Sequence, residues 1–573
     1  MKRLLKYMRD YRKECVLGPL FKLLEASFEL FVPLVMAAII DRGIAQGDVP
    51  FVWRMGGALL ALALVGLVCS ITAQYFAAKA SVGFVAKLKH ALFEHIQSLS
   101  FAARDNLGTS TMITRLTSDM NQVQSGVNLT LRLFLRSPFI VFGAMIMAFT
   151  VDAKSAWTFA VAIPVLSVVV FGIMLWTMPL YKRVQAGLDR VLGIVRENLT
   201  GVRVIRAFNQ EDNETTRFQE RNESLTKLQL LVGRISAAMN PLTYVILNAA
   251  LIVLIWSGAW RVEGGFITQG AVVALVNYMS QILVELIKLA NLIINMTKSL
   301  ACAGRIADVL ALEGGMTSGA KDAAGGTDAL VAFEDVSLTY EGAGEASLTG
   351  VSFRAARGQT IGIIGPTGCG KSTLVNLIPR FYDATAGRVL VDGADVKDWD
   401  LDKLRARVAV VPQKALLFKG TIAENLRWGK PDATDEELIE ALKTAQAWEF
   451  VEKREGGLNA AVEQNGRNFS GGQRQRLTIA RALVRRADIL ILDDSASALD
   501  LATDAKLRAA IRNMPGAPTV FIVSQRAASL MAADQIIVLD DGKVMGIGSH
   551  RELLQTCPVY QEIYHSQFPK EAA

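Results

Sequence analysis

The sequence predicts two domains of different fold class: an all-α membrane domain of six transmembrane helices, followed by an α/β domain. Hydrophobic residues make up 51% of the 573 residues and charged residues only 20%, whereas soluble proteins average about 25% charged residues. Long uncharged runs occur only in the first half of the chain. After residue 312 short apolar runs alternate with helical ones, which is typical of an α/β domain.

Four uncharged runs are long enough to cross a bilayer, because a helix rises about 1.5 Å per residue and about 20 residues span the hydrocarbon core. They lie at 55–78, 155–181, 235–260 and 264–284, and the last helix is expected to continue to 297. Two further spans, at 17–40 and 129–151, contain a few charged residues. The sequence therefore predicts six spans within residues 1–312.

The distribution of basic residues predicts the orientation of these spans. The first 13 residues contain six basic side chains and one acidic one, and the long loops at 79–128 and 182–234 are rich in Lys and Arg. The remaining loops are short and nearly neutral. The positive-inside rule places both termini and both long loops in the cytoplasm. Each long loop is expected to form two helices joined by a turn, near 106–110 and near 209–218.

Other classes of protein are excluded by composition. None of the five cysteines forms a C-x-x-C pair, and only four histidines occur, which argues against a disulfide framework, a structural zinc site and a histidine metal centre. The net charge of +7 does not require a nucleic-acid partner, because membrane proteins collect basic residues on their cytoplasmic side.

Residues 313–328 are rich in Gly, Ala and Ser and are expected to form a linker. Residues 329–573 then form the predicted α/β domain. We expect its strands to lie in a mostly buried sheet. They are predicted at 331–340, 360–365, 388–393, 407–413, 488–494, 519–524 and 535–540.

A phosphate-binding loop follows one of these strands directly. The segment reads G-P-T-G-C-G-K-S-T and matches the P-loop pattern in its strand–loop–helix setting. Its glycines turn backbone N–H groups towards phosphates, Lys371 reaches the β- and γ-phosphates, and the Ser372 hydroxyl binds Mg²⁺. The loop consists of Gly365, Pro366, Thr367, Gly368, Cys369, Gly370, Lys371, Ser372 and Thr373.

Two further segments complete the pattern of a nucleotide site. The apolar run 489–492 ends in Asp493, which is placed to hold the magnesium shell. The segment 469–476 reads F-S-G-G-Q-R-Q-R. This segment resembles the signature segment of ATP-binding cassette (ABC) transporters. Together with the P-loop, it makes the chain similar to exporter-type half-transporters, which fuse one membrane domain to one nucleotide-binding domain. The resemblance covers nearly the whole chain and implies ATP and Mg²⁺ as ligands.

The resemblance also implies roles for single residues. Tyr340 corresponds to the aromatic residue that stacks on adenine, and Gln413 to the loop glutamine that touches magnesium and reports to the membrane domain. Asp500 ends the loop 497–500, which crosses the dimer interface in the family. The signature residues close over the γ-phosphate of ATP held by the opposite subunit; here they are Ser470, Gly471, Gly472 and Gln473.

Two residues depart from the family pattern. The family has a glutamate that polarises the attacking water where this chain has Asp494, whose carboxylate reaches roughly 1.5 Å less far. The family has a histidine where this chain has Gln525, which donates a hydrogen bond but cannot become a cation. Together they predict a site that binds ATP but hydrolyses it slowly. The signature is intact, so the chain resembles the degenerate-site half of a heterodimer, whose partner carries Glu and His.

Charged residues within the predicted transmembrane spans suggest what kind of substrate the protein transports. Glu25 and Glu29 share one face of the first span, and Glu285 and Lys288 lie three apart near the end of the sixth. They form either a polar lining for amphiphiles or ion pairs near the interface. The favoured function is ATP-driven export of small amphiphilic molecules (drugs, lipids or peptides) from a bacterial inner membrane. An importer on the same fold, of the metallophore type, and an ATP-binding regulatory subunit stay open.

Overall fold

The computed structural model describes residues 4–312, 316–322, 325, 328–495, 497–514 and 516–568. It divides into two compact units. The helical unit comprises Met1–Gln97 and Gly108–Leu312, and the α/β unit comprises Ser98–Leu107 and Glu313–Ala573. The predicted fold class, six apolar helices followed by an α/β domain, is confirmed.

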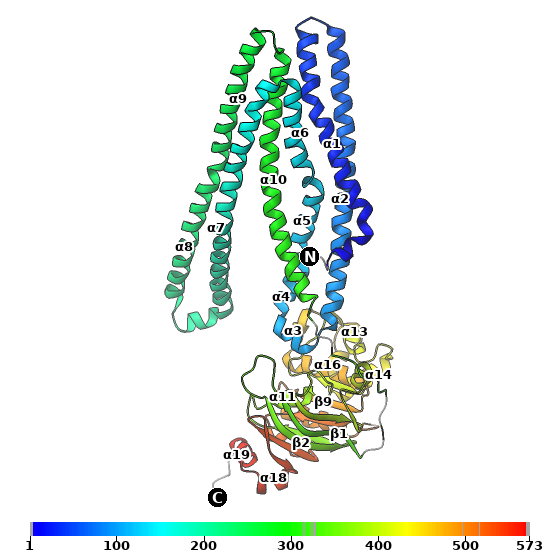
Figure 1. Cartoon of the computed structure of the whole chain (residues 1–573). Coiled ribbons are helices and arrows are strands. Elements are labelled where there is room, and N and C mark those ends of the chain that lie inside the picture. The colour runs from blue at the N-terminus through cyan, green and yellow to red at the C-terminus, as the bar shows by residue number, and fades with distance from the viewer. Residues whose placement is uncertain are drawn as a thin grey trace. The chain divides into compact units, whose positions relative to one another are not determined.

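The helical unit contains six helical segments that are long and apolar enough to cross a membrane (Figure 1). Several of them join more than one helix, and all extend beyond the predicted spans. The six segments are η1–α1–η2 (Leu4–Tyr11, Arg12–Ala38, Ile39–Ile44), α2 (Val49–Ser98), α4–η3–α5–α6 (Thr109–Thr114, Arg115–Asp119, Met120–Leu133, Arg136–Val151), α7 (Ala153–Ala207), α8–α9 (Glu211–Ala237, Met239–Glu263) and α10 (Gln269–Val309).

The third segment is interrupted where the sequence predicts one continuous span at 129–151. Helix α5 ends at Leu133 and α6 begins at Arg136. Pro138 lies two residues into α6. A proline lacks the N–H that continues a helix, and its ring conflicts with the carbonyl four residues earlier, here that of Phe134. The break therefore lies where a helix through Pro138 would be strained.

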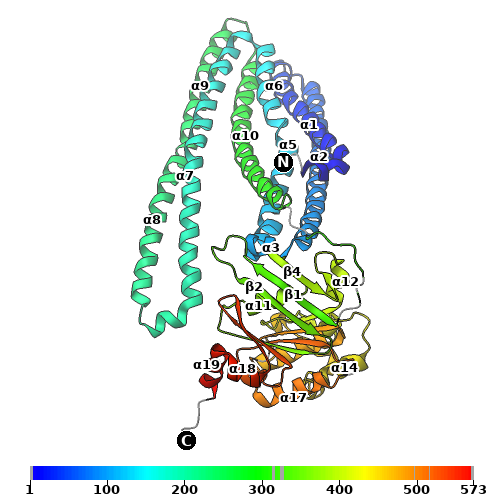
Figure 2. The same cartoon turned by 60° about the horizontal axis from the view of Figure 1, so that its bottom comes forward.

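Small residues let the transmembrane helices approach one another closely. Ala26, Ala144, Ala148 and Ala274 are completely buried in the core formed by α1, α6, α7, α9 and α10. Close backbone approach at small residues is the usual way in which membrane helices associate. The buried Tyr278 hydroxyl adds a polar contact by donating to the carbonyl of residue 30 (2.6 Å). Helices α7 and α8 form a long pair that stands away from α1 and α2 (Figures 1 and 2).

The α/β unit is built on two main sheets (Figure 2). The first is antiparallel, with the order β2-β1-β4-β5, and the second has the order β12-β11-β3-β10-β9-β6 and is parallel except for β12. The strands are β1 (Ala329–Leu338), β2 (Leu348–Ala356), β3 (Thr360–Ile364), β4 (Ala386–Val391), β5 (Ala394–Asp395), β6 (Val408–Val411), β9 (Ile489–Asp493), β10 (Thr519–Val523), β11 (Gln535–Asp540) and β12 (Lys543–Gly548). A small pair, β7 (Gly420–Thr421) with β8 (Ala461–Val462), lies outside them.

Each of the seven predicted strand segments overlaps an observed strand. The prediction of a single sheet is wrong, because these strands are divided between two sheets. Strands β2 and β12 were not expected. Buried and exposed residues alternate along most of β2, and β12 contains no buried residue. Both strands carry charged or glycine residues, so neither forms a continuous apolar run.

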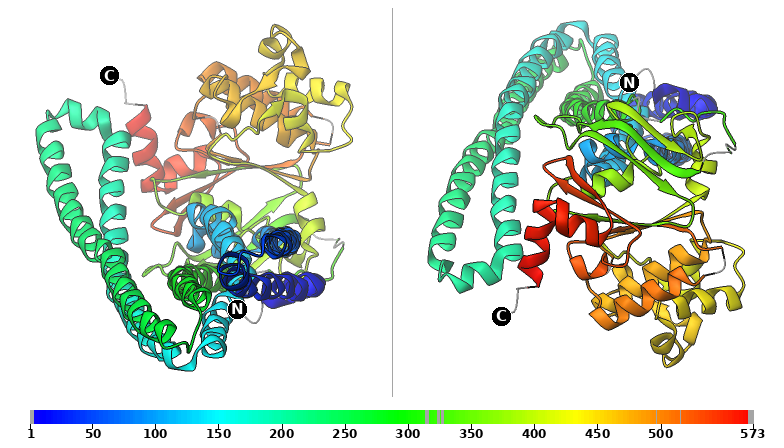
Figure 3. Two further views of the ribbon diagram at one scale, coloured as in Figure 1. Left: turned by 90° about the horizontal axis from the view of Figure 1, so that it is seen from above. Right: turned by 90° about the horizontal axis from the view of Figure 1, so that it is seen from below.

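The α/β unit also contains α11 (Lys371–Asn376), α12 (Leu401–Ala406), α13 (Ile422–Arg427), α14 (Asp435–Thr444), α15 (Trp448–Glu452), α16 (Gly471–Val484), α17 (Leu501–Arg512), α18 (His550–Thr556) and α19 (Pro558–Gln567). Helices α11, α12, α16, α18 and α19 contact strands of the larger sheet, whereas α13 and α14 pack on α16. Helices α18 and α19 lie beside β12 and β11 (Figure 3).

Trp399 holds the described part of the predicted linker. Its indole is fully buried and donates to the carbonyl of Val391 (3.1 Å). Its own carbonyl accepts from the N–H of Gly319 (2.9 Å), and Lys321 pairs with it as an isolated parallel bridge. Residues 316–322 therefore run against the α/β unit. Of the predicted linker 313–328, residues 313–315, 323, 324, 326 and 327 lie outside the described residues.

We predict that Trp399→Ala destabilises the α/β unit. Truncating a fully buried aromatic side chain costs about 3–5 kcal/mol, which lowers the thermal midpoint of a unit of this size by roughly 6 °C or more. Thermal unfolding of the full-length protein measures this shift. Trp428→Ala is the matched control, because Trp428 is 63% exposed. Equal shifts for the two variants would contradict the anchoring role of Trp399.

Candidate functional site

The register of the parallel strands gathers four loops at one edge of the larger sheet. Val523 of β10 lies opposite Ile363 of β3 and opposite Asp493 of β9. Strand β6 pairs with β9 so that Val411 lies opposite Leu492. Parallel strands that end in register deliver the residues that follow them to a common edge. The P-loop and residues 413, 494 and 525 consequently line one cavity of about 320 Å³.

The P-loop follows β3 directly, and its backbone conformation requires glycine. Gly370 has φ +93°, and a Cβ atom there would lie 2.6 Å from the carbonyl oxygen of Ser347. Only glycine fits a positive φ combined with such a close approach. Helix α11 begins at the next residue, Lys371, whose Nζ donates to the carbonyl of Gly365 (2.8 Å) and to that of Pro366 (2.5 Å). Lys371 is thus held at the mouth of the loop.

Oxygen atoms suitable for magnesium meet beside the loop. The Ser372 hydroxyl donates to Oδ1 of Asp493 (2.8 Å), and Gln413 lines the same cavity. Burial raises the pKa of Asp493, and the neighbouring charge of Asp494 adds to this, while the Ser372 hydrogen bond and Lys371 oppose it. Hydroxyl, carboxylate and amide oxygens are ligands that Mg²⁺ accepts. These three residues fit a magnesium ion, which would neutralise charge on the phosphates.

The two departures from the family pattern face the same cavity. Asp494 adopts φ +45°, and its Oδ2 lies 3.4 Å from Nε2 of Gln413. Gln525 follows β10, and the side chain of Gln567 in α19 fixes its backbone by donating to its carbonyl (2.7 Å). That same side chain accepts from the N–H of Ala527 (2.8 Å). The C-terminal helix therefore positions residue 525, which sequence reasoning did not foresee.

Tyr340 lines the cavity from the antiparallel sheet. Its hydroxyl donates to Oγ1 of Thr373 (3.1 Å), and its ring meets that of Tyr382 edge-on at 5.1 Å. The residues that the sequence assigned to ATP and Mg²⁺ are thus brought together around one loop.

The cytoplasmic helix α3 (Phe101–Leu107) packs on the α/β unit close to Tyr340. Phe101 lies against Phe381 with ring centroids 4.5 Å apart, and the Tyr382 hydroxyl donates to Asp105 (2.6 Å). Burial and this hydrogen bond raise the pKa of Tyr382. The sequence placed the turn of this loop at 106–110, whereas the packed segment is Ser98–Leu107. The second turn, near 209–218, belongs to the helical unit.

The signature residues do not line this cavity. Ser470 is the N-cap of α16: its hydroxyl accepts from the N–H of Gln473 (3.3 Å), and the Gln473 side chain accepts from the N–H of Ser470 (3.0 Å). A Cβ atom on Gly472 would lie 3.1 Å from the carbonyl oxygen of Ala498. Asp500 caps α17 by accepting from Thr503 (3.0 Å), and these hydrogen bonds lower its pKa.

Comparison with known proteins agrees with this arrangement. The profile of the ABC transporter transmembrane region matches residues 15–286, and the ABC transporter profile matches residues 348–497. An uncharacterized ABC transporter ATP-binding protein of Mycobacterium tuberculosis is 38% identical over 98% of this chain and 97% of its own length. This chain belongs to the ABC transporter family.

Two further likenesses concern the fold of the whole chain. An ATP-dependent lipid A-core flippase of Vibrio vulnificus is 28% identical over 99% of this chain and 97% of that protein. The fold is similar to that of a bacterial Atm1-family ABC exporter with ATP bound (TM-score 0.80, 23% identity, 98% of this chain and 99% of that chain). The chain is an exporter-type ABC half-transporter, an integral membrane protein with an ATPase domain.

A second candidate site lies within the helical unit of this ABC half-transporter. A cavity of about 390 Å³ opens between α1, α6 and α10. Its polar lining is formed by Glu29, Asn277, Ser280, Gln281, Glu285 and Lys288. Within the described residues, Oε1 of Gln281 is buried and has no hydrogen-bond partner.

Both sequence hypotheses for the charged residues describe part of this site. Arg136 pairs with two residues that line the cavity, Glu285 (2.7 Å) and Glu29 (2.6 Å). Lys288 also pairs with Glu285 (2.8 Å). Glu29, Glu285 and Lys288 line the cavity. Glu25 instead pairs with the buried Lys22 (2.5 Å) and does not line it. The charge of Arg136 near the start of the third span is visible in the sequence, but its partners are not, because they lie 149 and 107 residues away along the chain.

We predict that Glu285→Ala destabilises the helical unit, because it leaves the buried Arg136 guanidinium without its main partner. Removing one partner of a buried ion pair costs about 3–5 kcal/mol. The thermal midpoint of the purified protein measures this loss. Glu263→Ala, at an exposed position at the end of α9, is the matched control. A midpoint for Glu285→Ala that is no lower than that of the control would show that the ion pairs do not stabilise the unit.

Proposed function

We propose that this chain is one subunit of a heterodimeric ABC exporter that moves amphiphilic small molecules across the membrane by alternating access. In this proposal its own P-loop site binds ATP and Mg²⁺ but hydrolyses ATP slowly. Its signature segment completes the active site of a partner half-transporter that carries the family's glutamate and histidine. Two ATP molecules join the nucleotide domains, and hydrolysis at the partner's P-loop resets the cycle.

The shorter carboxylate of Asp494 is the observation that carries this proposal. The P-loop, Ser372 and Asp493 are arranged for binding, so a substituted general base changes turnover rather than affinity. Asp494 leaves its carboxylate roughly 1.5 Å short of the position a glutamate would reach. A misplacement of about 1 Å lowers the rate on the order of 10²-fold. The contact between Asp494 and Gln413 also keeps this carboxylate towards the magnesium side of the cavity.

Gln525 supports the same proposal. Its amide can donate a hydrogen bond towards the γ-phosphate, but it cannot take up a proton as imidazole does. Its backbone is fixed by Gln567, so the side chain starts from a defined position. The site therefore keeps the groups that hold nucleotide and lacks both groups that assist hydrolysis.

The intact signature supports the role in trans. Ser470 and Gln473 form a complete capping box at the start of α16. They do not line this chain's own cavity, which is consistent with an action on nucleotide bound by a partner. The two glycines between them leave the backbone open to a phosphate approaching the helix end.

The charged cavity supports an amphiphilic substrate with a polar or charged head. Two carboxylates and two cations line it or adjoin it, beside apolar residues of α1 and α10. Such a lining can accept a zwitterionic or hydrogen-bonding head while the apolar walls accept the hydrophobic part. The similarity to a lipid A-core flippase is in keeping with this class of substrate.

We predict losses of ATPase activity of very different size for two substitutions in the native complex. Asp494→Ala should lower steady-state ATPase by no more than about twofold, because this carboxylate contributes little to turnover. Ser470→Ala should lower it by about 10²-fold or more, because it removes a preorganised donor to the partner's γ-phosphate. ATPase activity of the complex in lipid nanodiscs measures both effects.

Ser549→Ala is the matched control for the cap, because Ser549 forms the same capping box at α18 and takes no part in the proposed site. It loses a helix cap without losing a phosphate donor. A fall in turnover with Asp494→Ala as large as that with Ser470→Ala would overturn the proposal of a slow site in this chain.

A further inference from the structure

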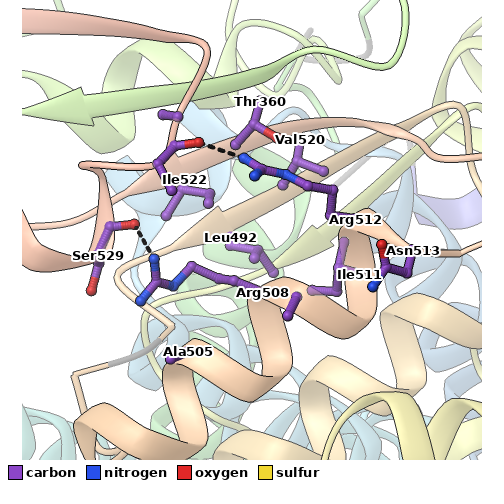
Figure 4. Close-up of a pocket in the computed structure, with 13 residues that line it drawn as sticks. Thr360, Leu492, Ala505, Arg508, Ile511, Arg512, Asn513, Val520, Ile522 and Ser529 are labelled. Atoms are coloured by element: carbon purple, nitrogen blue, oxygen red, sulfur yellow. Dashed lines mark hydrogen bonds between the residues drawn. The ribbon is translucent and has the colours of Figure 1, made fainter. Parts of the chain in front are cut away.

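A second cavity in the α/β unit lies between α17 and the larger sheet (Figure 4). Its volume is about 330 Å³, and it shares no lining residue with the nucleotide cavity. Leu492, Val520 and Ile522 from the sheet, together with Ile511 of α17, form an apolar floor. Its size falls within the range of small-molecule sites, which are mostly apolar with a few polar groups.

The spacing of small and basic residues along α17 creates this cavity. Ala505 and Ala509 lie four apart and both line it, so the helix presents two methyl groups where larger side chains would fill the space. Arg508 and Arg512 also lie four apart, and both line it as well. Residues four apart share one face of a helix. The cavity therefore has an apolar floor and two guanidinium groups that α17 contributes (Figure 4).

The two arginines are only partly neutralised by nearby carboxylates. Arg508 donates to the carbonyl of Ser529 (3.0 Å) and pairs with the buried Asp504 (3.1 Å). Its Nε is buried and has no hydrogen-bond partner among the described residues. Arg512 donates to the carbonyl of residue 532 and has no carboxylate partner within the described part of the chain. Asp534, which is exposed, accepts from the backbone N–H of Thr360 (2.7 Å) at the rim.

We propose that this cavity is an effector site for a small organic anion with an apolar body, such as an aromatic carboxylate. The apolar floor would take the body, and Arg512 with the Nε of Arg508 would donate to the carboxylate. Charge-assisted hydrogen bonds of this kind are about twice as strong as neutral ones. The arginines select against cations of the same shape.

Segments that line this cavity are connected to residues beside the nucleotide site. Helix α17 begins next to Asp500. On the opposite wall, Ser529 accepts from Arg508 and lies three residues after Arg526. Arg526 donates to the carbonyls of Leu499 (3.2 Å) and Ser497 (3.1 Å), which precede α17. An occupant that moves α17 would thus move the loop 497–500, and we expect it to change ATP turnover.

The test uses the full-length complex in lipid nanodiscs and three fluorinated probes of equal shape: 4-(trifluoromethyl)benzoate, 4-(trifluoromethyl)benzyl alcohol and 4-(trifluoromethyl)benzylamine. Broadening of the ¹⁹F resonance, corrected with empty nanodiscs, reports binding. We expect the benzoate to bind most tightly and the amine not to bind at this cavity. Saturating benzoate should change ATPase activity by about twofold or more.

Two variants locate the binding. Ala509→Leu fills the cavity and should abolish benzoate binding and its effect on ATPase. Arg512→Gln should weaken binding about tenfold, as the loss of one charge-assisted hydrogen bond implies. Lys506→Gln, which removes an exposed charge from α17 outside the cavity, should leave binding unchanged. Equal binding of the three probes, or unaltered benzoate binding in both Ala509→Leu and Arg512→Gln, would overturn the site. ATPase activity that does not respond to bound benzoate would overturn its effector role.

Discussion

The parallel pairing of β3, β10 and β9 is the constraint on which the nucleotide site depends. Because Val523 lies opposite both Ile363 and Asp493, the loops that follow these strands start from the same edge of the sheet. Lys371, Asp493 and Gln525 come from segments more than 30 residues apart and still line one cavity. A one-residue change of register in β9 would turn the side chain of Asp493 to the other face of the sheet. The chemistry of the ABC domain thus rests on backbone geometry that apolar strand residues determine.

The helical unit contains charged side chains in its transmembrane helices, where an unpaired charge is energetically costly. Arg136, Glu285 and Glu29 compensate one another, and Ser137 completes the coordination of Glu285 with a hydrogen bond of 2.8 Å. Buried ion pairs contribute little net stability, but losing one partner is costly. Such a network beside a cavity fits the polar substrate pathway that we propose.

Much of this architecture could be predicted from the sequence. Four uncharged runs and two apolar runs with a few charged residues predicted the six spans, because length and hydropathy largely decide whether a segment can cross a bilayer. The P-loop and strand 489–493 were recognisable because each couples a local pattern to its function. By contrast, β2 and β12 lack an apolar run, and the break before Arg136 depends on a single proline.

Contacts between distant residues could not be predicted. The pairing of Arg136 with Glu29 and Glu285, the packing of Phe101 on Phe381 and the hold of Gln567 on residue 525 all join residues that no local pattern relates. Each of them depends on how helices and loops meet in three dimensions. The substitutions at 494 and 525 were visible in the sequence only because the resemblance defined what should stand there.

The most direct test of a slow ATP site follows the γ-phosphate on each subunit. The complex is isolated from its native membrane through a tag on this chain, allowed to turn over with 8-azido-ATP labelled on the α- or γ-phosphate, and photolysed. We expect the α-label on both subunits and the γ-label only on this chain, because its nucleotide remains ATP. Loss of the γ-label from this chain as fast as from its partner, or isolation of this chain without a second half-transporter, would contradict the account.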